Sequence, residues 1–171
     1  MPIVSRSACS LLALALALGA CGGPALAPPP ATASQASAPR SVPFVEVAGT
    51  PNSRYGDDSE ALIVGTSAAT AARIVALVPQ ASAAPGRVLI AAFSGAQRTG
   101  GFAIHIDAVQ RDGDRLVVRA TFTEPSPGAF VTQALTSPAH VVSIAQADAA
   151  GASEALLLDA GGTERARATL P

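Results

Sequence analysis

The chain has 171 residues, with 11 basic and 12 acidic side chains and a formal net charge of −1. Nucleic-acid binding depends on clustered basic residues and on aromatic side chains for base stacking. Because Trp is absent and aromatic residues make up 4% of the chain, we expect no nucleic-acid partner. The sequence also contains no Lys, which excludes a Walker A phosphate loop and Schiff-base chemistry.

Residues 1–20 have the pattern of a secretory signal peptide. Arg6 is their only charge, and the apolar run 11–18 is shorter than the roughly 20 residues that a membrane-spanning helix needs. The segment ends in Leu18-Gly19-Ala20-Cys21, which resembles the lipobox of bacterial lipoproteins. The resemblance implies cleavage before Cys21 and attachment of lipid to its thiol.

Lipidation also accounts for a lone thiol. Cys9 lies in the predicted signal peptide, so Cys21 is the only Cys of the mature chain, and an unpaired thiol is a liability in an oxidising compartment. Each buried CH₂ of an acyl chain adds about 0.8 kcal/mol of membrane affinity. The residue after Cys21 is Gly22 and not Asp, which by similarity to lipoprotein sorting in Gram-negative bacteria implies the outer membrane. The alternative is a secreted protein cut after Ala20 without a lipid.

Residues 21–43 are predicted to be a tether between the lipid and a folded domain. Five prolines stand among small residues between positions 24 and 39, a composition that favours extended polyproline II and builds no core. At about 3.1 Å per residue such a tether reaches roughly 60 Å. Residues 44–171 remain, enough for one domain.

The first half of this domain shows three strand patterns and one helix. Alternating residues at 44–47 and a short apolar run at 61–64 predict strands on either side of a polar loop. Thr66 or Ser67 offers an N-cap for a helix that Pro79 ends, with one apolar face formed by Ala71, Ile74, Val75 and Val78. Residues 88–93 are apolar throughout, as in a central strand buried on both faces.

The second half consists of strands and turns. Residues 102–107 alternate, and Asp112-Gly113 predicts a hairpin to a strand at 116–122. A turn at 125–128, a strand at 141–144 and a last hairpin around Gly161-Gly162 follow. The sum is an α+β fold, mainly an antiparallel β-sheet or sandwich with one packed helix.

No residue pattern indicates an active site, and we expect no catalytic residues, metal or cofactor. His105 and His140 are too far apart in sequence for a compact metal-ligand spacing, and His105 is expected to face solvent. A triad of Ser94, either His and Asp107 lacks a nucleophile-elbow sequence. A calcium loop is also not indicated, because Asp57, Asp58 and Glu60 lack the Gly and terminal Glu of that pattern at the required positions. Asp112 and Asp114 flank a turn and are interpreted as structural.

Two segments stand out as candidate binding elements. In residues 95–102, Gly100 and Gly101 permit positive φ or close backbone approach, and Arg98 and Thr99 add hydrogen-bond donors. This loop either binds a partner or only sets strand register. The second segment, residues 130–140, has an extended residue before Pro138, and we hypothesise that it packs beside the first.

At these segments the chain resembles the C-terminal domain family of PrcB, a protease-complex subunit. The family has a strand that enters a loop like Arg98-Thr99-Gly100-Gly101-Phe102, and later a segment like 133–138 before another strand; the similarity covers about residues 87–145. This chain differs from the family pattern in having Phe102 where Tyr is usual, and in having no Pro in the loop. The resemblance implies a lipoprotein, because PrcB-like proteins are often lipoproteins. It also implies that the domain has no catalytic residues, because the founding member is a non-catalytic partner of a serine protease.

The predicted function is therefore that of a non-enzymatic, membrane-anchored lipoprotein, an accessory or stabilising subunit of an envelope protease. One alternative is a protease inhibitor, because Thr99-Gly100-Gly101-Phe102 is similar to a loop of chagasin-type inhibitors, although their Trp-containing loop is missing. Another is a structural envelope lipoprotein that binds a different ligand. The residues predicted to bind a partner are Arg98, Thr99, Gly100, Gly101, Phe102, Thr136 and Pro138.

Overall fold

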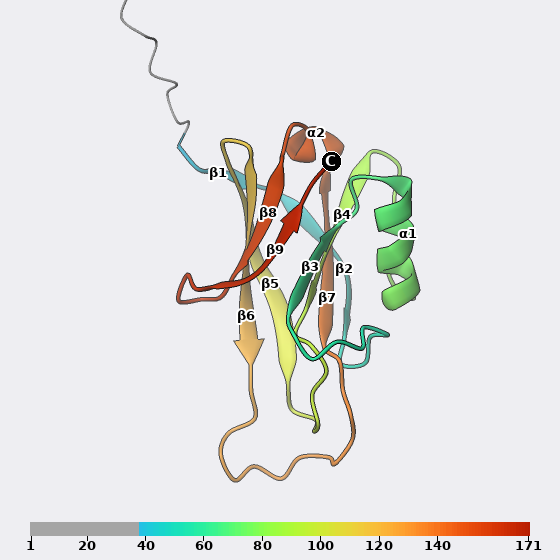
Figure 1. Ribbon diagram of the computed structural model, residues 1–171, viewed down its shortest axis with the longest axis vertical. Coiled ribbons are helices and arrows are strands. Elements are labelled where there is room, and N and C mark those ends of the chain that lie inside the picture. Colours follow the sequence, from blue (N-terminus) through green and yellow to red (C-terminus); the bar gives the residue numbers. More distant parts are fainter. Residues whose placement is uncertain (1–37) are drawn as a thin grey trace, which may run out of the picture. The chain divides into compact units, whose positions relative to one another are not determined.

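A computed structural model describes residues 38–171, which belong to one compact unit. They form two β-sheets and two helices (Figure 1). The predicted signal peptide, Cys21 and most of the predicted tether lie outside the described residues. Neither helix in residues 38–171 is both long and apolar enough to span a membrane.

The larger sheet has five strands and is antiparallel except for one neighbouring pair, β6 and β8. Its strands in spatial order are β1 (Arg40–Val42), β5 (Ala103–Asp112), β6 (Arg115–Thr123), β8 (Glu154–Leu158) and β9 (Glu164–Thr169).

The smaller sheet has four strands, all antiparallel to their neighbours. Their spatial order is β2 (Phe44–Thr50), β7 (Ala139–Ala145), β4 (Arg87–Phe93) and β3 (Ala61–Val64). Together with the helix that packs on this sheet, the two sheets confirm the predicted α+β class.

Strand β4 lies in the middle of the smaller sheet and separates two apolar clusters. One side of the strand, with Ile90 at its centre, faces the larger sheet. Leu89 and Phe93 on the other side pack with Ile74 and Val78 of the helix region. Because every residue from Val88 to Phe93 is buried, the predicted two-sided burial of this strand is confirmed.

Helix α1 (Ala68–Leu77) covers the outer face of the smaller sheet (Figure 1). Ser67 is its N-cap, and its side chain accepts a hydrogen bond from the backbone N–H of Thr70. The Thr70 side chain binds back to the backbone of Ser67 and completes a capping box. The helix ends just before Pro79, as predicted, since Pro cannot continue a helical hydrogen-bond ladder.

The two predicted hairpins are present, with Gly113 and Gly162 at positive φ in their turns. Two features differ from the sequence-based expectation. Strand β1 begins at Arg40, inside the range predicted as a tether, because it pairs with β5. Helix α2 (Gln146–Ala149) was not predicted, since four residues are too few to show a helical period.

Candidate functional site

Two loops meet at one end of the two sheets (Figure 1). Residues 94–102 connect β4 to β5, and residues 124–138 connect β6 to β7. The strand register brings them together, because Phe93 pairs with Ala139 and Ala103 pairs with Thr123. We call residues 94–102 and 124–138 the paired loops.

Backbone hydrogen bonds join the paired loops directly. Gln97 and Thr136 exchange two of them, with N···O distances of 2.7 and 2.9 Å, and the N–H of Gly100 donates to the carbonyl of Thr132 at 2.9 Å. The Thr136 hydroxyl also donates to the carbonyl of Thr99 at 2.9 Å. The hypothesis that the two segments pack side by side is confirmed.

Three glycines are required by the close packing around the first loop. A Cβ on Gly95, which has φ of +80°, would lie 2.5 Å from the carbonyl oxygen of Asp58, and a Cβ on Gly100 would lie 2.4 Å from the Thr132 hydroxyl. Gly101 adopts a φ of +90°. Only a residue without Cβ reaches these positions at little cost.

The seven predicted partner-binding residues all belong to the paired loops, but they differ in accessibility. Arg98 and Gly101 are exposed, and Thr99, Phe102 and Thr136 are half-buried. Gly100 and Pro138 are buried. These two residues can therefore shape the surface but offer a partner little or no side-chain contact.

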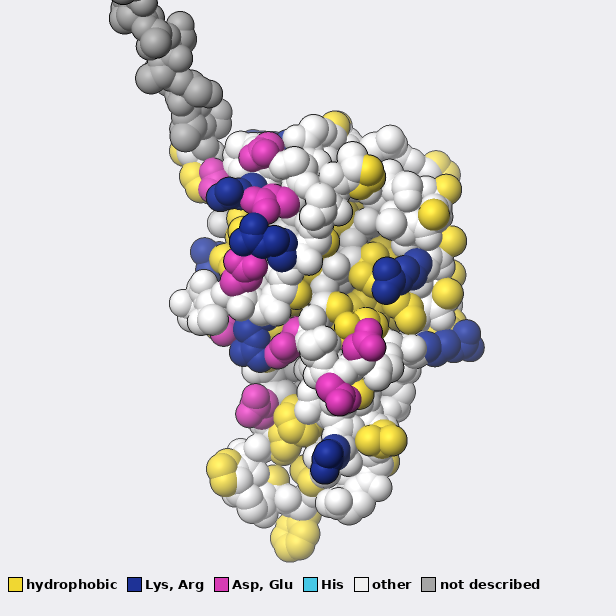
Figure 2. Space-filling view, viewed as in Figure 1, with side chains coloured by type: hydrophobic (Ala, Val, Ile, Leu, Met, Phe, Trp, Pro, Cys, Tyr) yellow, Lys and Arg dark blue, Asp and Glu magenta, His cyan; other side chains and the backbone are white. Residues whose placement is uncertain are grey.

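The most exposed large apolar side chains of the described residues also belong to the paired loops. Phe130 has a relative exposure of 107% and Leu135 of 79%. Apolar side chains protrude from this end of the domain, near an Arg side chain (Figure 2). Exposed apolar groups that cluster mark interaction sites. Sequence reasoning did not select Phe130 and Leu135, because a loop sequence does not show whether an apolar side chain is covered.

A surface pocket of about 500 Å³ opens beside Leu135. Apolar atoms of Phe102 and Leu135 line it together with polar groups, among them the side chain of Arg98. Such a mixture can take an apolar side chain of a peptide while the rim binds its polar groups. The residues lining the pocket are Asp58, Ala96, Gln97, Arg98, Thr99, Phe102 and Leu135.

The root of the second loop is held by a polar network around Ser137. Its hydroxyl donates to the carbonyl of Tyr55 at 2.7 Å and lies 2.8 Å from the hydroxyl of Ser53, and its N–H donates to the carbonyl of Pro51 at 2.9 Å. The Tyr55 ring stacks on Phe93 with centroids 4.7 Å apart. Burial, together with the nearby Asp57, raises the pKa of Tyr55, so this ring remains neutral. The paired loops thus rest on a well-packed base.

A second cluster, formed by Glu46, His105 and His140, lies between the sheets near the base of the paired loops. Candidate ligand atoms of the three side chains all lie within 4.8 Å of one another, and the His105 and His140 rings are 4.4 Å apart. The two His lie close together although they are distant in the sequence, because β5 and β7 face each other across the sandwich. The expected exposure of His105 is confirmed.

The other residues considered for chemistry make structural contacts. The Asp107 carboxylate accepts a hydrogen bond from the Thr121 hydroxyl at 2.8 Å, and Asp114 accepts one from Ser153 at 2.6 Å. Glu60 pairs with Arg165. Burial alone would raise the pKa of Glu60, but the hydrogen bond and charge of Arg165 hold it below its ordinary value.

In a comparison with protein families, residues 88–145 fit the model described as PrcB C-terminal. No curated protein and no solved structure matches the chain. The matched segment begins in β4, includes both paired loops and ends with β7. The resemblance inferred from the sequence is confirmed for residues 88–145, which match the family model described as PrcB C-terminal.

Proposed function

We propose that this protein is a non-enzymatic bacterial lipoprotein whose PrcB-like domain binds a protein partner through the paired loops. The observation that carries the proposal is the exposure of Phe130 and Leu135 on the paired loops, where Leu135 lines a pocket together with Arg98. Aromatic side chains and Arg supply much of the binding energy at protein interfaces.

The rigidity of the paired loops supports a binding role. Hydrogen bonds tie Gln97 to Thr136 and Gly100 to Thr132, and the hydroxyl of Ser137 anchors the base. A surface that is already ordered loses less conformational entropy on association than a mobile loop does. The paired loops therefore hold their exposed apolar side chains in a preorganised conformation before a partner binds.

The position of the paired loops also fits an anchored protein. Strand β1 enters the fold beside Arg111, near one end of β5, whereas the paired loops adjoin Ala103 at the other end. At about 3.3 Å per residue the two ends of β5 are roughly 30 Å apart. A lipid on Cys21, followed by an extended tether, would leave the loops free to meet a partner away from the membrane.

We propose an envelope protease as the partner and an accessory or stabilising role for this protein. The support is the PrcB C-terminal match at residues 88–145, which includes both loops. In this proposal the protein contributes a docking surface, and catalysis belongs to the partner.

In-cell crosslinking of the tagged protein in its own host, read by mass spectrometry, tests this proposal. We expect a protease to be enriched over a control lipoprotein, and to be lost from the double variant Phe130→Ser/Leu135→Ser. Val45→Thr is the matched control, because Val45 is an exposed apolar residue (56%) on the edge strand β2. If the double variant retained every crosslink, the paired loops would not be the docking surface.

Lipidation is tested separately with Cys21→Ser. We expect this variant to lose acylation and to leave the membrane fraction, because the proposed anchor is the lipid on that thiol. An unchanged membrane fraction for Cys21→Ser would show that the chain is held there by another means.

A further inference from the structure

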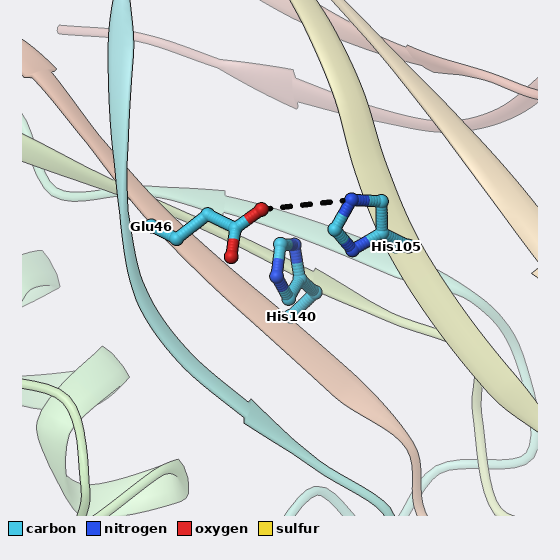
Figure 3. Close-up of side chains that lie close together, drawn as sticks. All are labelled: Glu46, His105 and His140. Atoms are coloured by element: carbon cyan, nitrogen blue, oxygen red, sulfur yellow. Dashed lines mark ion pairs between the residues drawn. The ribbon is translucent and has the colours of Figure 1, made fainter.

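The side chains of Glu46, His105 and His140 converge from three strands of two different sheets (Figure 3). Glu46 belongs to β2 and His140 to β7 of the smaller sheet, and His105 belongs to β5 of the larger sheet. His140 is 5% exposed, whereas the side chains of Glu46 and His105 are more than half exposed. The cluster therefore has a buried imidazole beneath an exposed carboxylate and an exposed imidazole.

Local backbone features make room for this arrangement. The pairing register shifts between Glu46 and Ala48 in β2, directly after the cluster residue Glu46. It also shifts between Ile106 and Ala108 in β5, directly after the neighbour of His105. Such bulges re-aim side chains at the edge of a site. Gly49 faces the His140 ring, and a Cβ there would lie 3.3 Å from its Cδ2 atom.

A metal site is the first function to consider for two His and one Glu. The hydrogen bonding of His140 argues against it, because the backbone N–H of Ile106 donates to His140 Nδ1 at 3.0 Å. That bond uses the Nδ1 lone pair and places the proton of the neutral ring on Nε2. A His that binds metal through Nε2 instead has a proton on Nδ1, which it donates to an acceptor.

The same hydrogen bond connects the two sheets, since it joins β5 of one to β7 of the other. We propose that His140 is a pH-sensitive latch, which holds β5 against β7 while its imidazole is neutral and releases this contact when the ring takes up a proton. The proposal does not depend on the function proposed for the paired loops.

The chemistry of the latch follows from the donor and acceptor roles of imidazole. Protonation adds a proton to Nδ1, so both ring nitrogens become donors. The Ile106 N–H would then face another N–H group, and a buried donor without an acceptor is destabilising. The local contact between β5 and β7 is therefore incompatible with a charged His140 in its present position.

The charged groups around His140 do not remove this conflict. From β5, His105 and Asp107 face the ring, and Glu46 faces it from β2; the neighbouring residues of β4, Ala91 to Phe93, carry no charge. Asp107 already accepts a hydrogen bond from Thr121. Burial, and next the charge of His105, lower the pKa of His140, while Glu46 and Asp107 act in the opposite direction.

The sign of the effect on stability follows from this direction. Because the folded-state pKa of His140 lies below the unfolded value of about 6.5, the unfolded chain takes up the proton first as the pH falls. Stability is therefore full above about pH 6.5 and declines toward the folded-state pKa. The chain contains two His, so few other side chains titrate in this range.

Amide hydrogen exchange at Ile106, measured by NMR on the whole protein in detergent micelles, tests the latch. After correction for intrinsic exchange, we expect protection to fall by up to about tenfold per pH unit below about pH 6.5. In His140→Asn, whose side-chain carbonyl can accept from Ile106 without titrating, protection should stay constant. His105→Gln is the second variant and should reduce the pH dependence without abolishing it, because it removes the neighbouring imidazole.

A titration of the unmodified protein keeps the proposal testable even if the variants misfold. The Ile106 amide shift and the His140 ring shifts should change together, with one common midpoint below the ordinary imidazole value. Constant Ile106 protection from about pH 7.5 to 5.5, or different midpoints for the two groups, would overturn the latch. Tight Zn²⁺ binding at neutral pH that is lost in His140→Asn would overturn it as well, by showing that the ring serves as a metal ligand.

Discussion

The paired loops and the β5–β6 hairpin turn lie at opposite ends of strands β5 and β6, and both need glycine, but for different reasons. Gly113 in the hairpin turn has φ of +58°, and an added Cβ there would meet no atom within 4 Å. Gly95 in the paired loops has φ of +80°, and an added Cβ there would lie 2.5 Å from the Asp58 carbonyl oxygen. Gly113 is needed only for its left-handed backbone conformation, whereas Gly95 is needed for that conformation and also because Asp58 packs against it.

The difference shows that the hairpin turn depends on its own residues, whereas the paired loops depend on contacts with distant parts of the chain. A two-residue turn such as Gly113-Asp114 is specified by its own residues, because the required φ is a local property. The paired loops are specified by contacts between positions far apart in the chain, such as Gln97 with Thr136. Substitutions should therefore cost more in the paired loops than in the hairpin turn.

The largest expected effect is that of Gly95→Ala. The new methyl group meets backbone, which cannot move aside cheaply, and the positive φ adds strain, so we expect a loss of about 3 kcal/mol or more in unfolding free energy. Urea denaturation measures it through the midpoint at constant slope. Gly56→Ala is the control, because a Cβ on Gly56 meets nothing within 4 Å and its φ is not positive; equal losses for both would refute the comparison.

Gly100→Ala should have an intermediate effect that a second substitution reverses. The atom in the way is the Thr132 hydroxyl, 2.4 Å from the added Cβ, while the next atom is 3.7 Å away. We expect a loss of about 1–2 kcal/mol, and recovery of most of it in Gly100→Ala/Thr132→Ala, measured as a double-mutant cycle by urea denaturation. Additive losses would show that Gly100 is needed for a reason other than this contact.

Gly113→Ala should cost about 1 kcal/mol, because only the left-handed backbone conformation is penalised. Gly113→Asn should cost less, since Asn tolerates this conformation better than Ala does. The midpoint of thermal unfolding for the two variants checks the order. A loss for Gly113→Ala as large as that for Gly95→Ala would contradict the idea that this turn is locally determined.

The smallest expected effect is that of Glu60→Gln, which removes the ion pair between the residue before β3 and Arg165 of β9. Both side chains are about one-third exposed, so we expect a loss of at most about 1 kcal/mol at neutral pH. Because the folded-state pKa of Glu60 is lowered, this contribution is present above the unfolded pKa and disappears as the pH falls through the folded value. The stability difference from the unmodified protein should therefore shrink below about pH 4; a difference independent of pH would exclude the ion pair as its cause.

Much of the secondary structure could be predicted from local pattern alone. The continuous apolar run of β4 predicted its burial on both faces. The N-cap candidates Thr66 and Ser67, of which the structure uses Ser67, and Pro79 predicted the limits of α1. These features depend on side-chain periodicity and on capping chemistry, which act over a few residues. The parallel pairing of β8 with β6 was beyond prediction, because nothing in either strand specifies its neighbour.

The candidate sites divide in the same way. The Gly-rich loop and its partner segment could be selected from the sequence through composition and family resemblance. The exposure of Phe130 and the burial of Pro138 could not, because exposure depends on what the rest of the chain covers. The Glu46–His105–His140 cluster was missed for the same reason, since its members are distant in sequence.

By itself the sequence determined the composition of a near-neutral protein without Lys, its turns and caps, the two-sided burial of β4 and the family resemblance of residues 88–145. These properties follow from residue types and short-range geometry. Only the tertiary structure decided which loops share a surface, which apolar side chains remain uncovered and which imidazole is buried between the sheets. Those outcomes depend on long-range strand pairing, and a local pattern contains no information about the distance between strands that pair across the whole domain.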